Sequence, residues 1–305
     1  MQNDYQQVVK EVFLRHLIEG SIKDNEALHV TTGVSIVDLS THRTILNHNQ
    51  DTEQFAASIN KLPVGLLLLE DLRSGKLSLD QTLTWTADDR RDGFGDYDKP
   101  DSPTSAPLRD VLKDMLNKSG NTAVRIMVNN ALGGAVKVNE RLAAKPQLSH
   151  TRLQPLDANR FYLGNSTPHD SLWALDQMMR KQDKYAKFMK DAMSTNIFED
   201  FGVRSQLADS EYILLANKIG TLDDVEGNNR HDVGIIYNKK TKKSYGYSLF
   251  TTAPYNETDP VATTQADQSL KDMGRSMLRF AGSRKTYDYV GNGEWRKHIE
   301  RRVNY

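Results

Sequence analysis

The sequence has 305 residues, with 40 lysines and arginines against 40 aspartates and glutamates, and no cysteine. A chain of this length can bury a substantial core in one large or two modest domains. The balanced charge argues against a nucleic-acid-binding or anionic-membrane-binding protein, which needs a basic surplus. The absence of cysteine excludes thiol nucleophiles, thiolate metal sites and disulfides.

The longest strongly apolar run, 66–69, is far shorter than a membrane-spanning helix of roughly 20 residues. The first residues lack the basic, apolar and small regions of a signal peptide. We therefore expect a soluble globular protein with no membrane span and no signal peptide in this chain.

The first half of the chain predicts a helix over 4–20 and then a strand hairpin, 29–39 and 43–48. Helical spacing returns over 57–73, and Pro63 places the start of this helix near Ser58, because proline is tolerated only in a first turn. Loops are predicted over 88–107 and 151–167, and helices over 108–115, 122–132, 135–145 and 168–192.

The remaining chain predicts three strands, 212–218, 233–237 and 245–252, and a closing helix over 270–280. The short connections favour an antiparallel sheet, and a helical insertion within a sheet is typical of α+β folds. We expect one α/β subdomain from 1–55 and 200–282, an all-helical subdomain over 56–199, and a basic C-terminal extension over 283–305. A solvated helix or strap is the favoured interpretation of that extension, with a partner site as the alternative.

A Ser-x-x-Lys sequence, Ser58 to Lys61, lies where a loop enters the apolar helix. Residues three apart share one helix face, so the two side chains can meet. A lysine in a dry cleft can lose its proton and act as a base toward the serine hydroxyl, and N–H groups at a helix start favour a developing oxyanion. Taken alone, the motif also fits a helix-capping serine followed by a solvated lysine.

A second motif, Ser119-Gly120-Asn121, lies between two predicted helices. Its serine could relay a proton to a leaving nitrogen and its asparagine could hold a carbonyl group. The same three residues also suit a plain helix cap.

A third motif, Lys218-Ile219-Gly220-Thr221, ends a predicted strand. Lys218 could attract a carboxylate, and Gly220 would let a ligand lie along the strand edge. The N–H of Thr221 could join that of Ser58 as an oxyanion donor. A strand ending in a turn, with its lysine in water, is the alternative.

In order and spacing the three motifs resemble the Ser-x-x-Lys, Ser-Asp-Asn and Lys-Thr-Gly set of class A β-lactamases and penicillin-binding proteins. The resemblance extends to the nucleophile helix at 55–80, the Ser-Asp-Asn helix at 119–134 and the beginning of the Ω loop at 151–153. It covers roughly residues 25–282. It implies a β-lactamase/transpeptidase-like α+β fold, with a five-stranded antiparallel sheet flanked by the N- and C-terminal helices and a large all-helical insertion.

The resemblance also implies a serine acyl-transfer enzyme that needs no metal or organic cofactor. Ser58 would attack a β-lactam or D-alanyl-D-alanine amide with Lys61 as base, and Ser119 would pass the proton to the leaving nitrogen. Asn121 would bind the acyl side chain, while Lys218 and Thr221 would hold the substrate carboxylate and the oxyanion. None of the eight histidines lies in a metal-ligand spacing.

Deacylation is where the chain departs from the pattern. Class A β-lactamases carry a glutamate four residues after the Thr-Arg-Leu that begins the Ω loop, and counting forward from Thr151 gives Asp157. Aspartate is one methylene shorter, and a displacement of about 1 Å can cost roughly a hundredfold in rate. We expect Asp157 to activate the deacylating water, with an ordinary loop aspartate as the alternative.

Three more positions differ from the family. Gly120 replaces its aspartate, Ile219 replaces its hydroxyl residue, and Val233 stands where many β-lactamases carry a carboxylate-binding arginine. Arg230 or His231 is expected to approach from the loop before Val233.

The leading hypothesis is a β-lactam-opening hydrolase. The alternatives are a penicillin-binding carboxypeptidase or transpeptidase with slow deacylation and a non-turnover β-lactam-binding sensor. The family implies a small-molecule β-lactam or cell-wall peptide as partner and an extracytoplasmic location, and we expect a monomer that binds no nucleic acid.

Overall fold

The computed structural model describes the chain except residues 1, 208–211, 225–226, 256–259 and 282–305. The predicted C-terminal extension, 283–305, therefore lies outside the described residues. The main sheet has five antiparallel strands in the order β2-β1-β10-β9-β8. These strands are β1 (Thr31–Asp38), β2 (Arg43–His48), β8 (Tyr212–Asp224), β9 (Gly227–Asn238) and β10 (Ser244–Ala253). The predicted α+β class and five-stranded antiparallel sheet are confirmed.

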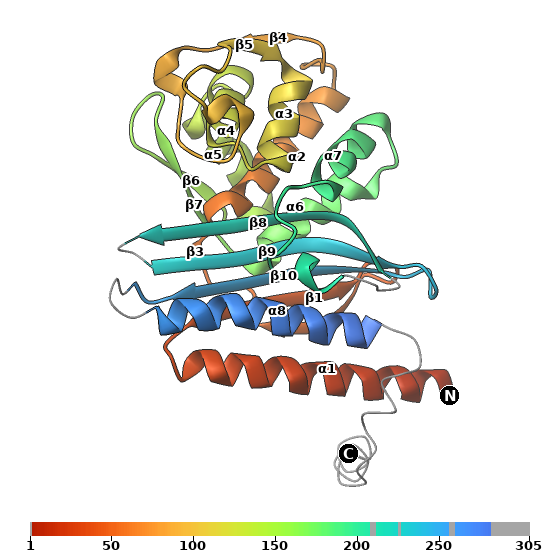
Figure 1. Ribbon diagram of the computed structural model, residues 1–305. Coiled ribbons are helices and arrows are strands. Elements are labelled where there is room, and N and C mark those ends of the chain that lie inside the picture. The colour runs from red at the N-terminus through yellow and green to blue at the C-terminus, as the bar shows by residue number, and fades with distance from the viewer. Residues whose placement is uncertain (1, 208–211, 225–226, 256–259, 282–305) are drawn as a thin grey trace.

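Two terminal helices, α1 (Gln2–Glu26) and α8 (Val261–Ala281), lie side by side across one face of this sheet (Figure 1). Leu14 and Ile18 of α1 and Met273 of α8 share a buried cluster with Ile36 and Tyr247 of the sheet. Both helices are longer than their apolar patterns predict. The apolar face of α1 continues past the expected stop at Gly20 to the buried Ile22.

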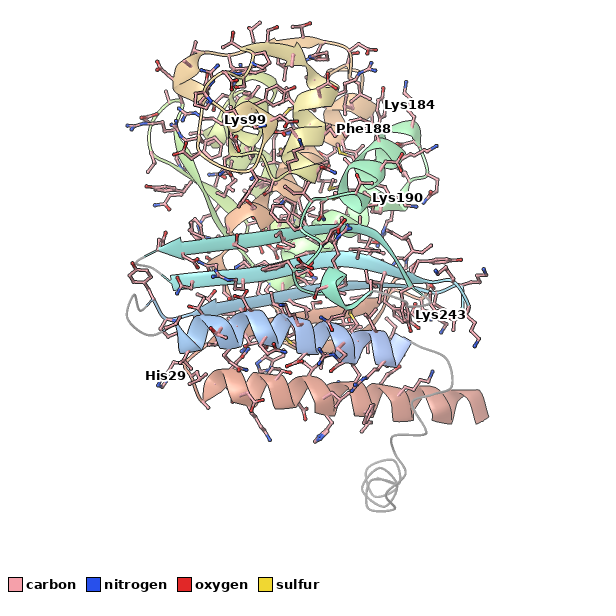
Figure 2. All side chains as sticks on the ribbon, in the orientation of Figure 1. His29, Lys99, Lys184, Phe188, Lys190 and Lys243 are labelled. Carbon is pink, nitrogen blue, oxygen red and sulfur yellow. The ribbon has the colours of Figure 1, made fainter. Side chains whose placement is uncertain are left out.

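The opposite face of the sheet carries the helical insertion, with α2 (Lys61–Arg73) at its centre (Figure 1). Nearly every residue of α2 is buried, because other helices surround it. These are α3 (Leu108–Asn117), α5 (Ala135–Ala143), α6 (Pro168–Arg180) and α7 (Lys184–Ser194), and α4 (Asn121–Ile126) packs against α3. Figure 2 shows the labelled side chains Lys184, Phe188 and Lys190 along α7, on the same side of the sheet.

The prediction that 56–199 is all helical is wrong in detail. This segment contains the pair β4 (Thr82–Thr84) and β5 (Ser105–Pro107), and two strands of a second small sheet in the order β3-β7-β6, whose strand β3 comes just before the segment. Its strands are β3 (Gln54–Phe55), β6 (Arg152–Pro155) and β7 (Phe161–Ser166). The predicted loop over 151–167 is thus a β-hairpin, in which Asp157 closes the turn and the aromatic residues Phe161 and Tyr162 begin the second strand.

Three predicted helices also have different bounds. The helix over 57–73 opens as a 3₁₀ turn, Ala57–Asn60, before α2. The helix over 122–132 changes after Ile126 into a π-helical turn, Met127–Ala131. The helix over 168–192 divides into α6 and α7, because the Asp183 carboxylate accepts hydrogen bonds from the first N–H groups of α7 and caps it.

In the described part of the chain, no helix combines the length and apolar character needed to cross a membrane. The same residues bring together no group of three or more His, Asp or Glu side chains that could hold a metal ion.

Candidate active site

Ser58 lies in the 3₁₀ turn that precedes α2, pressed against the edge strand β8. A Cβ at Gly220 of β8 would come within 2.8 Å of the Ala56 carbonyl oxygen, so only glycine allows this close approach. Gly220 was expected to make room for a ligand. Its contacts show that it packs β8 against the nucleophile turn, and its role toward a ligand stays a prediction. Ala57 has a left-handed φ of +46°, a strained backbone of the kind that gathers at functional sites.

The Lys61 amine lies at the bottom of the site and is completely buried. Its Nζ is 3.0 Å from Ser58 Oγ, 3.1 Å from Ser119 Oγ and 3.0 Å from Asn121 Oδ1. Burial lowers the pKa of Lys61 to about 7, against the opposing effect of the Asp98 and Asp114 carboxylates. The amine is therefore able to take a proton from Ser58 near neutral pH.

Ser119 joins the two lysines of the site. Its hydroxyl accepts from Lys61 and lies 2.8 Å from the Nζ of Lys218, which also donates to the Ile219 carbonyl. Burial, and then the neighbouring Lys61 charge, hold the pKa of Lys218 well below its usual range. Ser119 has a left-handed φ of +60° in the turn between α3 and α4. That strained turn places its hydroxyl between the two amines.

Asn121 begins α4 and turns its side chain toward Lys61. Its Oδ1 accepts from Lys61 Nζ, and its Nδ2 donates to the Asp92 carbonyl at 2.7 Å. Behind it, the Asp98 carboxylate accepts from the backbone N–H groups of Asn121 and Thr122. Asp98 thus caps α4 and fixes the turn that carries Ser119.

The structure explains why Gly120 stands where the family has aspartate. A Cβ at this position would overlap the Oδ2 atom of Asp114 on α3. Asp114 is buried, and burial raises the pKa of its carboxyl to about 6. A carboxylate is therefore present in this turn, but α3 supplies it.

Sequence reasoning did not find Asp98 or Asp114. Asp98 lies in the predicted loop and Asp114 on a predicted helix, where surface positions are common for aspartate. The one available signal is the absence of the family's aspartate at residue 120.

A cleft of about 800 Å³ opens above Ser58. Ser119, Asn121, Ile219 and Thr221 also line it. Apolar and aromatic side chains form much of the rest: Phe55, Phe94, Leu156, Phe161, Tyr162 and Phe198. The rings of Phe94 and Phe198 meet edge to face at 5.5 Å, although Phe94 is 66% exposed.

Asp157 lies outside this arrangement, which corrects the expectation that it activates a deacylating water. It occupies the exposed turn between β6 and β7, where its carboxylate accepts from the N–H groups of Asn159 and Arg160 and pairs with the Arg160 guanidinium. These donors lower the pKa of Asp157, the Asn159 N–H most of all. Asp157 does not line the cleft, so the loop-aspartate alternative describes it.

The residues proposed to replace a carboxylate-binding arginine are engaged elsewhere. Arg230 lies in β9, not in a loop, and its guanidinium pairs with Asp223 and Asp267. His231 is buried in the same strand and donates from Nε2 to the Phe55 carbonyl while Nδ1 accepts from the Thr251 N–H. Burial lowers the pKa of His231 to about 4. Val233 is buried beside Lys218.

Solved structures with the same fold include β-lactamases and a protein titled PBP-A. The chromosome-encoded β-lactamase of Vibrio parahaemolyticus is 20% identical, with a TM-score of 0.73 over 88% of this chain and 100% of its own. A β-lactamase from Xanthomonas campestris pv. campestris is 17% identical, with a TM-score of 0.73, and the match covers 90% of this chain and 99% of the β-lactamase. A mutant of PBP-A, solved as an acyl-enzyme complex with penicillin G, is 18% identical, with a TM-score of 0.70, and the match covers 87% of this chain and 96% of PBP-A.

Curated protein sequences yield no match to this chain. A family model described as "Beta-lactamase enzyme family" matches residues 14–279, which include all the strands of the main sheet and every residue of the site described above. The chain therefore belongs to the beta-lactamase enzyme family.

Proposed function

We propose that the protein is a serine acyl-transfer hydrolase in which Ser58 opens β-lactam or D-alanyl amides and forms an acyl-enzyme. One observation carries the proposal. Ser58 Oγ, Lys61 Nζ, Ser119 Oγ and Lys218 Nζ form a continuous chain with separations of 3.0, 3.1 and 2.8 Å. The chain joins a nucleophile, a base with a pKa of about 7 and a relay hydroxyl.

The acylation step uses three members of this chain: Ser58, Lys61 and Ser119. Neutral Lys61 accepts the Ser58 proton as Oγ forms a bond to the amide carbonyl carbon, and the carbonyl oxygen becomes an oxyanion. The N–H groups of Ser58 and Thr221 are the proposed oxyanion donors. The carbon–nitrogen bond then breaks, and the leaving nitrogen takes a proton from Ser119, which regains one from Lys61. The acyl group remains on Ser58.

Hydrolysis of this acyl-enzyme is expected to be slow. Among the described residues, no carboxylate oxygen lies within ion-pair distance of Lys61 or Lys218, and Asp157 is engaged with Arg160. Within the described residues, Asp92 and Asp224 are the carboxylates that line the cleft, and neither is hydrogen-bonded to Ser58, Lys61 or Ser119. This favours the second candidate function, a penicillin-binding carboxypeptidase or transpeptidase, over an efficient β-lactamase. A β-lactam-binding sensor would share the long-lived adduct.

A chromogenic cephalosporin, followed by both colour and intact mass, tests the proposal. We expect one adduct per chain on Ser58 and little steady colour, while Ser58→Ala should give no adduct. Rapid steady turnover would instead identify a β-lactamase. If the unmodified protein gives neither adduct nor turnover, the proposed function is wrong.

β-lactams and cell-wall peptides lie outside the cytoplasmic membrane. We therefore propose an extracytoplasmic location for the protein, on the strength of its substrate class. A monomeric state remains a prediction.

A further inference from the structure

Arg125 of α4 lines the cleft. It follows Asn121 by four residues, so both side chains share one face of the helix. The Arg125 side chain is only 8% exposed, yet it lines the same cleft as Ser58 and Asn121. A buried cation thus adjoins the place where the acyl part of a substrate would lie.

The Arg125 guanidinium is poorly satisfied. Its Nε is buried without a hydrogen-bond partner. Within the described residues, the one carboxylate at ion-pair distance is that of Asp89, 3.5 Å from Nε, and Asp89 already accepts from the N–H of Thr86. A buried N–H donor that has no acceptor is costly, and Nε of Arg125 is such a donor. The arrangement suits an acceptor that enters the cleft from outside.

Other cations near the cleft already have partners. Arg160 pairs with Asp157, Arg230 pairs with Asp223 and Asp267, and Arg91 donates to backbone carbonyl groups. The amines of Lys61 and Lys218 make the hydrogen bonds described above. Arg125 differs from all of these in that its buried Nε has no hydrogen-bond partner, in a side chain that lines the cleft.

We propose that Arg125 binds an anionic group, a carboxylate, on the acyl side of the substrate. This inference rests on the proposed function of Ser58 and names the substrate class of that site. Asn121 is the group expected to hold the carbonyl of the acyl side chain, and Arg125 lies one helical turn farther along the same face. The carboxylate therefore belongs to the acyl side chain, the part that remains on Ser58 after the amide opens. A carboxylate would receive two parallel N–H donors from one guanidinium.

Two penicillins test this inference: benzylpenicillin and its derivative with one added carboxylate on the α carbon of the phenylacetyl side chain. Reversible binding to the Ser58→Ala protein is measured by calorimetry, so no covalent step is needed. We expect the dicarboxylate to bind about tenfold more tightly, since a charge-assisted hydrogen bond contributes about that much. Arg125→Gln in the same background should abolish the preference, and Arg125→Lys should retain part of it.

Arg160→Gln is the matched control, because its charge is already paired with Asp157, and it should keep the preference. Asp89→Asn removes the carboxylate nearest Arg125 and should increase the preference for the dicarboxylate. This variant tests the inference even if Arg125→Gln does not fold. The inference would be overturned if the two penicillins bind equally or if neither binds. It would also be overturned if the preference survives Arg125→Gln or if Asp89→Asn does not increase it. Failure of the unmodified protein to form an adduct would remove only the proposed function.

Discussion

The amines of Lys61 and Lys218 are held close together by one hydroxyl, that of Ser119. Two ammonium groups in a dry site repel each other and lack solvation, so the folded protein favours the state in which at least one is neutral. The same burial that would be a cost for a structural lysine makes Lys61 a base near neutral pH. The reactivity of Ser58 thus depends on how dry its surroundings are.

The pH dependence of acylation follows from this. Because the pKa of Lys61 is lowered to about 7, the acylation rate should rise about tenfold per pH unit below pH 7 and level off above it. Lys61→Ala should remove this rise and slow acylation by a factor of about 10² to 10⁴. Adduct formation on Ser58 is followed by intact mass between pH 5 and 9. A rate that does not change with pH over this range would contradict the role of Lys61 as base.

At the level of elements, the hairpin of β6 and β7 replaces the loop expected beside the nucleophile. Its turn is closed by the Asp157 carboxylate, which accepts two backbone hydrogen bonds. Counting residues from the family's Ω loop led to the right segment but not to its conformation. In a β-hairpin, a shift of the strand pairing by one residue moves each side chain to the opposite face of the sheet.

The hairpin gives a second prediction. Asp157→Asn should leave the lifetime of the Ser58 adduct unchanged, because Asp157 does not line the cleft and asparagine keeps the turn. The decay of the adduct is followed by intact mass after excess β-lactam is removed, with the unmodified protein alongside. A clearly longer lifetime in the variant would restore Asp157 to the deacylation step.

The elements that local sequence determines were predicted well. Apolar periodicity found the strands of the main sheet and the helices on both faces, and the three motifs found Ser58, Lys61, Ser119, Asn121 and Lys218, whose contacts the structure gives. What the sequence could not show depends on contacts between distant residues. Asp98 reaches α4 from the 3₁₀ turn Asp96–Asp98, Asp114 fills the space left by Gly120, and Arg125 lies among neighbours that no spacing rule describes.

At the scale of the whole molecule, the helical insertion packs on the sheet through α6, against β1, β9 and β10, and through α7, against β8. Asp232 of β9 is paired with Ile219 of β8. Its buried carboxylate accepts hydrogen bonds from the N–H of Val203, the amide of Asn217 and the hydroxyl of Tyr247. These partners come from the segment before β8, from β8 itself and from β10. Because Asn217 precedes Lys218, the same network fixes the part of β8 that enters the active site.

Asp232 also sets a pH dependence of stability. Burial raises the pKa of its carboxyl from 3.8 to about 6. Below about pH 4 the Asp232 carboxyl is protonated in both the folded and the unfolded chain, and its full contribution to the free energy of unfolding is present. Between pH 4 and 6 the unfolded chain ionises first, so stability is lost as the pH rises, by about 1.4 kcal/mol per pH unit.

Asp232→Asn removes this titration. Relative to the unmodified protein, the variant should therefore gain free energy of unfolding, of the order of 3 kcal/mol, between pH 4 and pH 7. Urea unfolding of both proteins at the two pH values measures the difference, with Asp51→Asn, at an exposed carboxylate, as the control. If the difference in free energy of unfolding between the two proteins stays constant with pH, Asp232 of the folded protein is already ionised throughout the range from pH 4 to pH 7. The network behind β8 would then be held by a permanent charge, with the donors from Val203, Asn217 and Tyr247 fully compensating its burial.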